Sequence, residues 1–128
     1  KDFKVFGSSP VLPVSWYLDA VRYLRELKGD IPIVVFSDQI AVARELFRGT
    51  RGLSYFPFDD VASFSAMTQA GHGVLSASTF SWWAARIARI QNPDGIFIAP
   101  RYWMGFKSKQ WFPHPAIEAS FLDYREVD

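Results

Sequence analysis

The pattern of apolar and polar positions predicts short strands that alternate with amphipathic helices. Residues 33–36 and 96–99 are apolar throughout, which is typical of strands buried on both faces of a parallel sheet. Residues 53–56 and 73–77 are two further predicted strands between turn signals. Residues 1–6 are a candidate edge strand.

Between these strands, apolar residues recur three and four positions apart, as in a helix. The first predicted helix has Ser15 as its N-cap and ends at Gly29-Asp30. Three others follow Ser37-Asp38, Asp59-Asp60 and Ser78-Thr79, whose side-chain oxygens can cap a helix. The residues predicted to face the core are Tyr17, Val21, Leu24 and Leu27, then Ile40, Ala43 and Phe47, then Val61, Phe64 and Met67, and last Phe80, Trp83, Ile87 and Ile90.

Strands that alternate with helices in this way predict βαβ units. The expected fold class is therefore α/β, a Rossmann-like parallel sheet of about four to five strands with helices on both faces. The 128 residues suffice for one domain with a single core. A turn at residues 92–95 precedes the last predicted strand, and residues 101–128 form an aromatic and basic C-terminal flap with a candidate helical turn at residues 116–121.

Composition and charge exclude several classes of function. The chain has no Cys, which excludes disulfides, thiolate metal sites and a cysteine nucleophile. Its formal net charge of +1 gives no overall field that would attract nucleic acid, so an anion needs a local site. No apolar run approaches the ~20 residues that a membrane span needs. Because the chain starts at Lys1 without a leader, we interpret the start as a truncation or proteolytic boundary.

The strongest candidate site lies where a buried strand runs into Ser78, Thr79, Phe80 and Ser81. In open α/β sheets, ligands bind at the carboxyl ends of the strands. The N–H groups and dipole of the helix that begins here suit a phosphate, and the hydroxyls add donors. An ordinary N-cap is the alternative, since Ser and Thr are favoured there in any case. Trp82 lies off the predicted inner face, where it would meet a ligand or a second surface.

Carboxylates follow two other predicted strands. Asp38 is a candidate for binding a ribose hydroxyl or a base edge, or else it is only the N-cap of the next helix. The pair Asp59-Asp60 could bind metal or act as a general base, although acids are favoured at any helix start. His72 is predicted to be a turn residue, and His114 lies between two prolines; no spacing of His or acidic residues predicts a metal site.

Residues 101–115 combine five aromatic residues with three cations and no acid. Such a segment can stack on a sugar or a base and attract phosphate, or it can fold over the core as a flap. If it lines a cleft, we expect Trp82, Tyr102 and Trp103 to be more exposed than Trp83. The resulting apolar patch would favour self-association.

Several of these residues occur in an order that resembles the family 11 glycosyltransferases, the α-1,2-fucosyltransferases and their bacterial relatives, which use GDP-fucose. The string S-T-F-S-W-W at residues 78–83 is the most specific match. Phe36-Ser37-Asp38 matches upstream of it, and Ile98-Ala99-Pro100 and Trp103 match downstream. With Trp16-Tyr17 before the first helix, the resemblance extends over nearly the whole chain.

The resemblance implies one half of a GT-B-type glycosyltransferase, the C-terminal domain that binds the nucleotide-sugar donor. It implies an inverting fucosyltransferase that needs no metal or other cofactor, with GDP-fucose as donor and a galactose-containing glycan as acceptor. It assigns no catalytic residue. The implied donor-binding residues are Ser78, Thr79, Phe80, Ser81, Asp38, Trp82, Asp60 and Trp103.

The sequence also departs from the family pattern. The upstream His-x-Arg-Arg-x-Asp signature, whose arginine neutralises the donor's pyrophosphate, is absent, and Gln39 replaces the second acid of F-S-D-D. We therefore expect this chain to be inactive by itself and to need the missing N-terminal half as its partner. In a bacterium the enzyme would be cytoplasmic or peripheral to a membrane, and in a eukaryote it would lie in the Golgi lumen. The alternative is a non-catalytic α/β module that binds a nucleotide or a protein.

Overall fold

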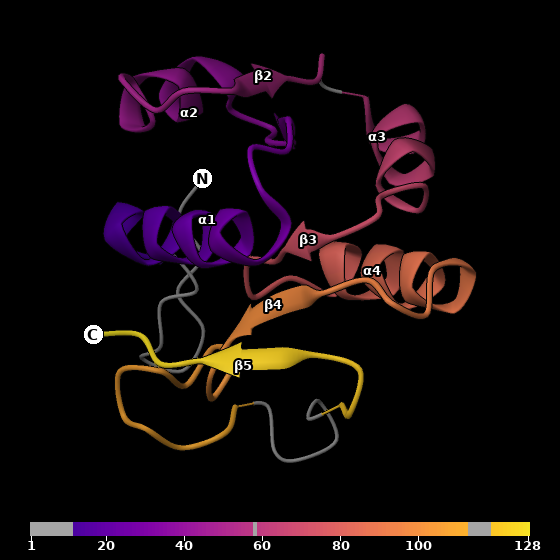
Figure 1. Cartoon of the computed structure of the whole chain (residues 1–128). Helices are drawn as coiled ribbons and strands as arrows, with labels where there is room; N and C mark the ends of the chain where they lie inside the picture. Colours follow the sequence, from indigo (N-terminus) through magenta and orange to yellow (C-terminus); the bar gives the residue numbers. More distant parts are fainter. Residues whose placement is uncertain (1–11, 58, 113–118) are drawn as a thin grey trace.

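The computed structural model describes residues 12–57, 59–112 and 119–128, in which helices and strands alternate as predicted (Figure 1). The candidate strand at residues 1–6, His114 and residues 116–118 lie outside the described residues. The elements are α1 (Val14–Lys28), β1 (Ile33–Val35), α2 (Ile40–Leu46), β2 (Leu53–Tyr55), α3 (Asp60–Met67), β3 (Gly73–Val74), α4 (Thr79–Gln91), β4 (Phe97–Pro100) and β5 (Asp123–Arg125).

Every strand pair in the described residues is parallel, which confirms the α/β prediction, but the strands form two sheets. β1 pairs with β2, and β3, β4 and β5 form a separate three-stranded sheet in that order. The expectation of one continuous sheet of four to five strands is therefore wrong. β3 pairs with β4 through only Gly73 and Val74, and α1 packs against β3 and lies between the two sheets (Figure 1).

The three-stranded sheet has a helix on each face, as the sequence predicted. β4 lies at its centre, and successive side chains of a strand point to opposite faces. Phe97 and Ala99 belong to the buried cluster that includes Ala85 and Ala88 of α4. Ile98 belongs to the other cluster, which is built largely from α1. β4 is therefore buried on both sides.

α4 buries a different face from the one that its sequence predicted. Phe80 is 41% exposed, Trp83 57% and Ile90 65%, so the prediction that these residues face the sheet is wrong. Small side chains lie at the buried face and let the helix backbone approach the sheet closely. They are Ser81, Ala84, Ala85 and Ala88. Trp82 packs beside them against the core, with its ring 5.4 Å from that of Phe121.

The ends of the helices follow the sequence signals more closely than their faces do. Gly29 ends α1 with a positive φ of 84°, and the N–H of Gly95 bonds to the Asn92 carbonyl in the predicted turn, at 2.9 Å. The N-cap position of α1 is Pro13 rather than Ser15. The inner faces of α1 and α3 are also partly corrected, since Leu27 is 52% exposed and Val61 80%.

No helix in the described ranges is both long enough and apolar enough to cross a membrane.

β5 was not predicted, because its sequence Asp-Tyr-Arg carries no apolar signal. It nevertheless pairs with β4 along the register Ile98 to Asp123, Ala99 to Tyr124 and Pro100 to Arg125.

Candidate functional site

The strand-to-helix junction at Ser78 has the geometry that the sequence predicted. Ser78 is the N-cap of α4 in an extended conformation, and its Oγ accepts a hydrogen bond from the Ser81 N–H at 3.2 Å. Thr79 and Phe80 follow in the exposed first turn. The first N–H groups of an α-helix have no acceptor within the helix, so this turn presents donors and a positive dipole end.

Ser81 shapes the junction from the inside. Its side chain is buried, and its Oγ donates to the carbonyl oxygens of Ser76 at 3.2 Å and Ser78 at 3.0 Å. The Ser78 N–H also donates to the Ser76 carbonyl, at 2.8 Å. Because the Ser81 hydroxyl and N–H both bond within the turn, the outward donors of the first turn are those of Thr79 and Phe80.

Tyr17 of α1 packs against the buried cluster on the α1 face of the sheet, in agreement with the prediction that it faces the core. Burial raises the pKa of Tyr17 to about 12, and the nearby Ser76 side chain opposes part of this shift. The Tyr17 ring lies edge-on to Trp16 and Phe47, with centroids 5.3 Å and 5.9 Å away.

Trp103 packs in the core next to the segment before the junction and does not line the candidate site. Its side chain is fully buried, at 0% exposure, in the cluster that contains Leu75 and Ala77. The expectation that Trp82, Tyr102 and Trp103 are more exposed than Trp83 is therefore wrong, because Trp83 is the most exposed of the four. Tyr102 and Trp103 both have positive φ, 68° and 56°, and this tight turn after β4 directs the indole back into the core.

The carboxylates predicted for the site occupy three different settings. Asp59 caps α3, because its carboxylate accepts from the N–H groups of Val61 at 3.1 Å and Ala62 at 3.4 Å. Its role is therefore that of a helix-capping acid, the alternative to a metal ligand or general base. Asp60 is exposed in the first turn of α3. α3 packs on α4. Phe64, one turn after Asp60, lies 5.3 Å from Phe80 between ring centroids, which brings the starts of the two helices near each other.

Asp38 follows β1 and is exposed, but β1 belongs to a different sheet from β3. The N-cap position of α2 is Gln39, and the Ser37 Oγ accepts from its N–H at 2.9 Å. Asp38 is therefore not the capping residue. The structure thus brings Asp60, Ser78, Thr79, Phe80 and Ser81 to one pair of helix starts, whereas Asp38 follows the other sheet.

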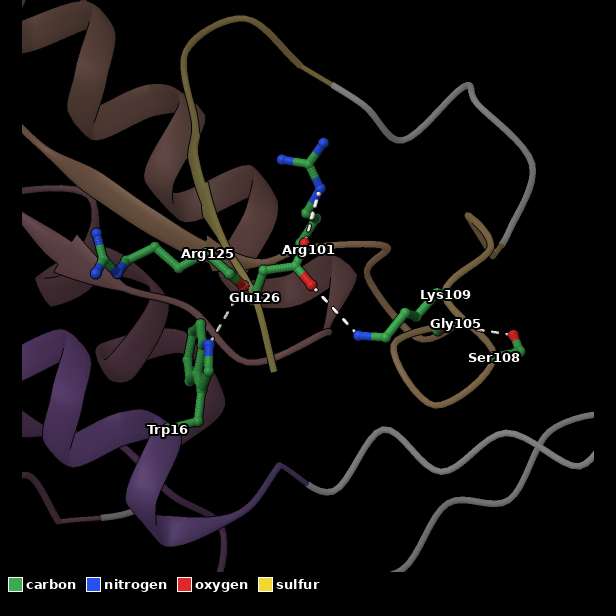
Figure 2. Close-up of polar contacts among 7 residues, drawn as sticks. All are labelled: Trp16, Arg101, Gly105, Ser108, Lys109, Arg125 and Glu126. Atoms are coloured by element: carbon green, nitrogen blue, oxygen red, sulfur yellow. Dashed lines mark hydrogen bonds and ion pairs between the residues drawn. The ribbon is translucent and has the colours of Figure 1, made fainter. Parts of the chain in front are cut away.

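The basic flap carries less unpaired charge than its sequence suggested. Figure 2 shows Glu126, which follows β5, between Arg101 and Lys109. Its carboxylate oxygens lie 3.1 Å from Arg101 Nε and 3.4 Å from Lys109 Nζ. Glu126 therefore supplies the acid that residues 101–115 lack, and its ion pairs with two of the three cations there join the flap to the segment after β5. This arrangement favours the covering role over phosphate binding.

A surface hollow of about 340 Å³ opens between α1 and the residues after β5. Three acids, Asp19, Glu126 and Asp128, line it with the single cation Arg125, so its net negative charge is unsuited to a diphosphate. Among the residues that the structure describes, no three His, Asp or Glu side chains gather in a way that could hold a metal ion. The start of α4 is therefore the better candidate for an anion.

His72 has a structural role, as predicted for a turn residue. Its Nδ1 accepts a hydrogen bond from the Ile96 N–H at 3.0 Å and thereby joins the turn before β3 to the start of β4. Burial lowers the pKa of His72, and the positive charge of Lys28 lowers it further. The neutral imidazole is the form that the fold uses.

With this geometry established, comparisons with known proteins identify the family. Residues 12–112 match the model of glycosyl transferase family 11. The chain belongs to this family. The matched residues include α1, the junction at Ser78 and the turn at Trp103, so the family 11 region covers every element of the candidate site.

Two curated relatives of this chain come from Escherichia coli. The O-antigen biosynthesis glycosyltransferase WbnK is 30% identical over 104 residues, which cover 77% of this chain and 33% of that protein. An alpha-1,2-colitosyltransferase is 31% identical over 94 residues, which cover 69% of this chain and 31% of that protein. The chain thus spans about a third of the length of these relatives. No solved structure matches it.

Proposed function

We propose that this chain is the donor-binding half of a glycosyltransferase, and that the complete enzyme transfers fucose from GDP-fucose to a galactose-containing glycan. The observation that carries the proposal is the start of α4, where a capped helix turn faces outward from the carboxyl end of β3. This turn lies inside the region that matches family 11. One relative is named for the transfer of colitose, so the nucleotide part of the donor is what the test below addresses.

In this proposal the first turn of α4 holds the diphosphate of the donor. The N–H groups of Thr79 and Phe80 and the Thr79 hydroxyl donate to phosphate oxygens, and the helix dipole favours their negative charge. These donors also stabilise the charge that develops on the departing GDP. Preorganised donors of this kind are worth ~10²–10³ in rate in other enzymes.

The proposed reaction is a direct displacement with inversion at the anomeric carbon. The acceptor hydroxyl oxygen forms the new bond to that carbon as the bond to the GDP oxygen breaks, and the hydroxyl proton passes to a base. We assign that base to the missing half or to the acceptor side, and no catalytic residue to this chain. In this proposal metal is not required, because the helix dipole and N–H groups of this chain act together with the arginine of the upstream signature to offset the diphosphate charge.

The two exposed carboxylates are suited to the uncharged parts of the donor. In our proposal Asp60, at the neighbouring helix start, and Asp38, after β1, accept hydrogen bonds from ribose hydroxyls or from the guanine edge. Each would need to lie away from the phosphates, because like charges repel at short range.

We also propose that this chain alone transfers no sugar, since the arginine-bearing signature lies in the missing half. An assay with radiolabelled GDP-fucose and a galactose-terminated acceptor should give no product above background. Measurable transfer by the 128-residue chain would contradict this part of the proposal.

A second candidate function follows from one observation, the exposed apolar face of α4. Phe80, Trp83 and Ile90 give this helix a surface that a non-catalytic module could use to bind a protein. This alternative predicts protein binding without affinity for nucleoside diphosphates.

Calorimetric titration with GDP, UDP and guanosine, in the presence of EDTA, separates these candidates. The proposal predicts that GDP binds, that guanosine binds much more weakly, and that UDP is discriminated against. Equal binding of GDP and UDP would support a diphosphate site but contradict recognition of the guanine base. No binding of either diphosphate would overturn the donor-binding function and favour the second candidate.

A further inference from the structure

The start of α4 and Arg101 leave the three-stranded sheet at the same edge. β3 and β4 are parallel, and the Leu75 N–H continues their ladder by donating to the Ile98 carbonyl at 2.8 Å. Pro100 has no N–H and ends the ladder. Ser78 and Arg101 each lie three residues beyond the bond between Leu75 and Ile98. The strand register therefore places Arg101 beside the junction that begins α4.

β5 holds Arg101 from the other side. The Arg101 N–H donates to the Arg125 carbonyl at 2.8 Å, and Glu126 follows directly. Figure 2 shows the Glu126 carboxylate facing Arg101, with 3.1 Å between Oε2 and Nε. The two side chains are 47% and 51% exposed, so a solute can reach this ion pair. Exposed ion pairs favour the paired state by at most about fivefold, and a better acceptor can displace the carboxylate.

The charges at this edge suit an anion that has not yet bound. Glu126 pairs with both Arg101 and Lys109, so two cations share one carboxylate and the cluster keeps one net positive charge. Residues 76–82, at the start of α4, contain no Lys or Arg, and a helix dipole amounts to only about half a charge. A guanidinium binds phosphate oxygens in pairs and would supply what the helix start lacks.

We infer that Arg101 is a further binding residue for the donor diphosphate, and that Glu126 competes with the diphosphate for it. The inference rests on the proposed donor-binding function. Without the donor, the ion pair joins the flap to the segment after β5. When a diphosphate binds at the first turn of α4, the guanidinium exchanges the carboxylate for phosphate oxygens, and Glu126 thus lowers the affinity of the chain for diphosphates.

Calorimetry at low salt with GDP, inorganic pyrophosphate and guanosine tests the two roles. Arg101→Gln should weaken GDP and pyrophosphate about three- to tenfold, the worth of a charged hydrogen bond less that of the displaced ion pair, and leave guanosine unchanged. Arg101→Lys keeps the charge without the planar fork and should lose less. Glu126→Gln should tighten both diphosphates about two- to fivefold, because the competitor is gone.

The matched controls are Arg48→Gln and Glu45→Gln, which change the net charge by the same amounts. These residues form an exposed ion pair at the end of α2, beside the other sheet. Neither control should change the affinity for a diphosphate. The double variant of Arg101→Gln and Glu126→Gln should bind GDP like Arg101→Gln alone, since Glu126 acts through Arg101. Urea unfolding shows whether each variant is folded.

Other results would overturn the inference. If Arg101→Gln and Arg101→Lys weaken GDP no more than Arg48→Gln does, Arg101 does not bind the diphosphate, while the donor site stands. If Glu126→Gln still tightens GDP when Arg101 is absent, the competition does not act through Arg101. If the wild-type chain binds neither GDP nor pyrophosphate, the donor-binding function fails, and this inference fails with it.

Discussion

At the scale of single residues, Ser78 combines a structural task with a proposed functional one. Its Oγ caps α4 through the Ser81 N–H, and its backbone begins the turn that faces outward. Substitution can separate the two tasks, because Asp is as good an N-cap as Ser but carries the same charge as a phosphate.

Ser78→Asp should therefore keep the stability of the chain and lose its affinity for GDP. Ser78→Ala should cost about 1 kcal/mol of unfolding free energy, since the cap is lost, and weaken GDP binding less than Ser78→Asp does. Urea unfolding measures the first effect and calorimetry the second. GDP binding by the Ser78→Asp chain at wild-type affinity would contradict a diphosphate at this turn.

His72 should make the stability of the chain depend on pH. The pKa of His72 lies below its usual 6.5 in the folded chain, whereas in the unfolded chain it returns to that value. Below about pH 6.5 the unfolded chain therefore binds more protons than the folded chain, and the free energy of unfolding falls as the pH falls. Above that pH His72 is neutral in both states and adds no pH dependence to the free energy of unfolding. Protonation of Nδ1 would also break the bond from the Ile96 N–H.

His72→Asn should reduce this dependence, because an amide oxygen can accept from Ile96 without titrating. Urea unfolding at pH 7.5 and pH 5.5 compares the two chains. The wild type should lose more stability than the variant between these values. An equal loss in both would show that other groups cause the pH dependence.

At the scale of elements, α4 shows why its start could be predicted and its buried face could not. The start depends on local chemistry, a strand followed by Ser78, and the structure confirms it. The face depends on which stripe meets the sheet, and α4 has two apolar stripes. The large residues had the stronger helical spacing, but the alanines allow closer packing, and Ala84 is fully buried.

The other differences between the predictions and the structure also arise from tertiary contacts that local sequence patterns do not specify. β5 pairs through its backbone with β4, which an apolar pattern does not report. Trp103 lies in an aromatic and basic segment of the sequence but turns inward, because two successive residues adopt positive φ. The parallel strands, the stop at Gly29 and the turn at residues 92–95 were predicted because each depends on a local preference.

The exposed face of α4 leads to a prediction about packing and self-association. Trp83→Lys should lower the unfolding free energy by no more than about 1 kcal/mol, because Trp83 is mostly in solvent and loses an edge-on contact with the Trp82 ring at 4.9 Å between centroids. Ala84→Leu should cost about 1–3 kcal/mol, because Ala84 is fully buried and the added atoms have no space around it. Light scattering after gel filtration should show that Trp83→Lys lowers any self-association. A large loss of stability in Trp83→Lys would mean that this face is buried.

At the scale of the whole molecule, the chain has little net charge, and its candidate anion site is a local feature of one helix start. The flap, which looked basic in the sequence, is balanced by Glu126 (Figure 2). The sheet with its two covering helices thus serves as the support, and the strand ends carry the proposed chemistry, as in other open α/β folds.

The most direct test of this account is to observe where GDP contacts the chain. In a titration of ¹⁵N-labelled chain with GDP, we expect the largest changes in amide chemical shift at Thr79 and Phe80. Smaller changes should follow at Ser76 and at the start of α3, where Asp60 lies. GDP that left Thr79 and Phe80 unchanged, or whose largest shifts fell in residues 101–112 or beside the hollow at Asp19, would contradict the account.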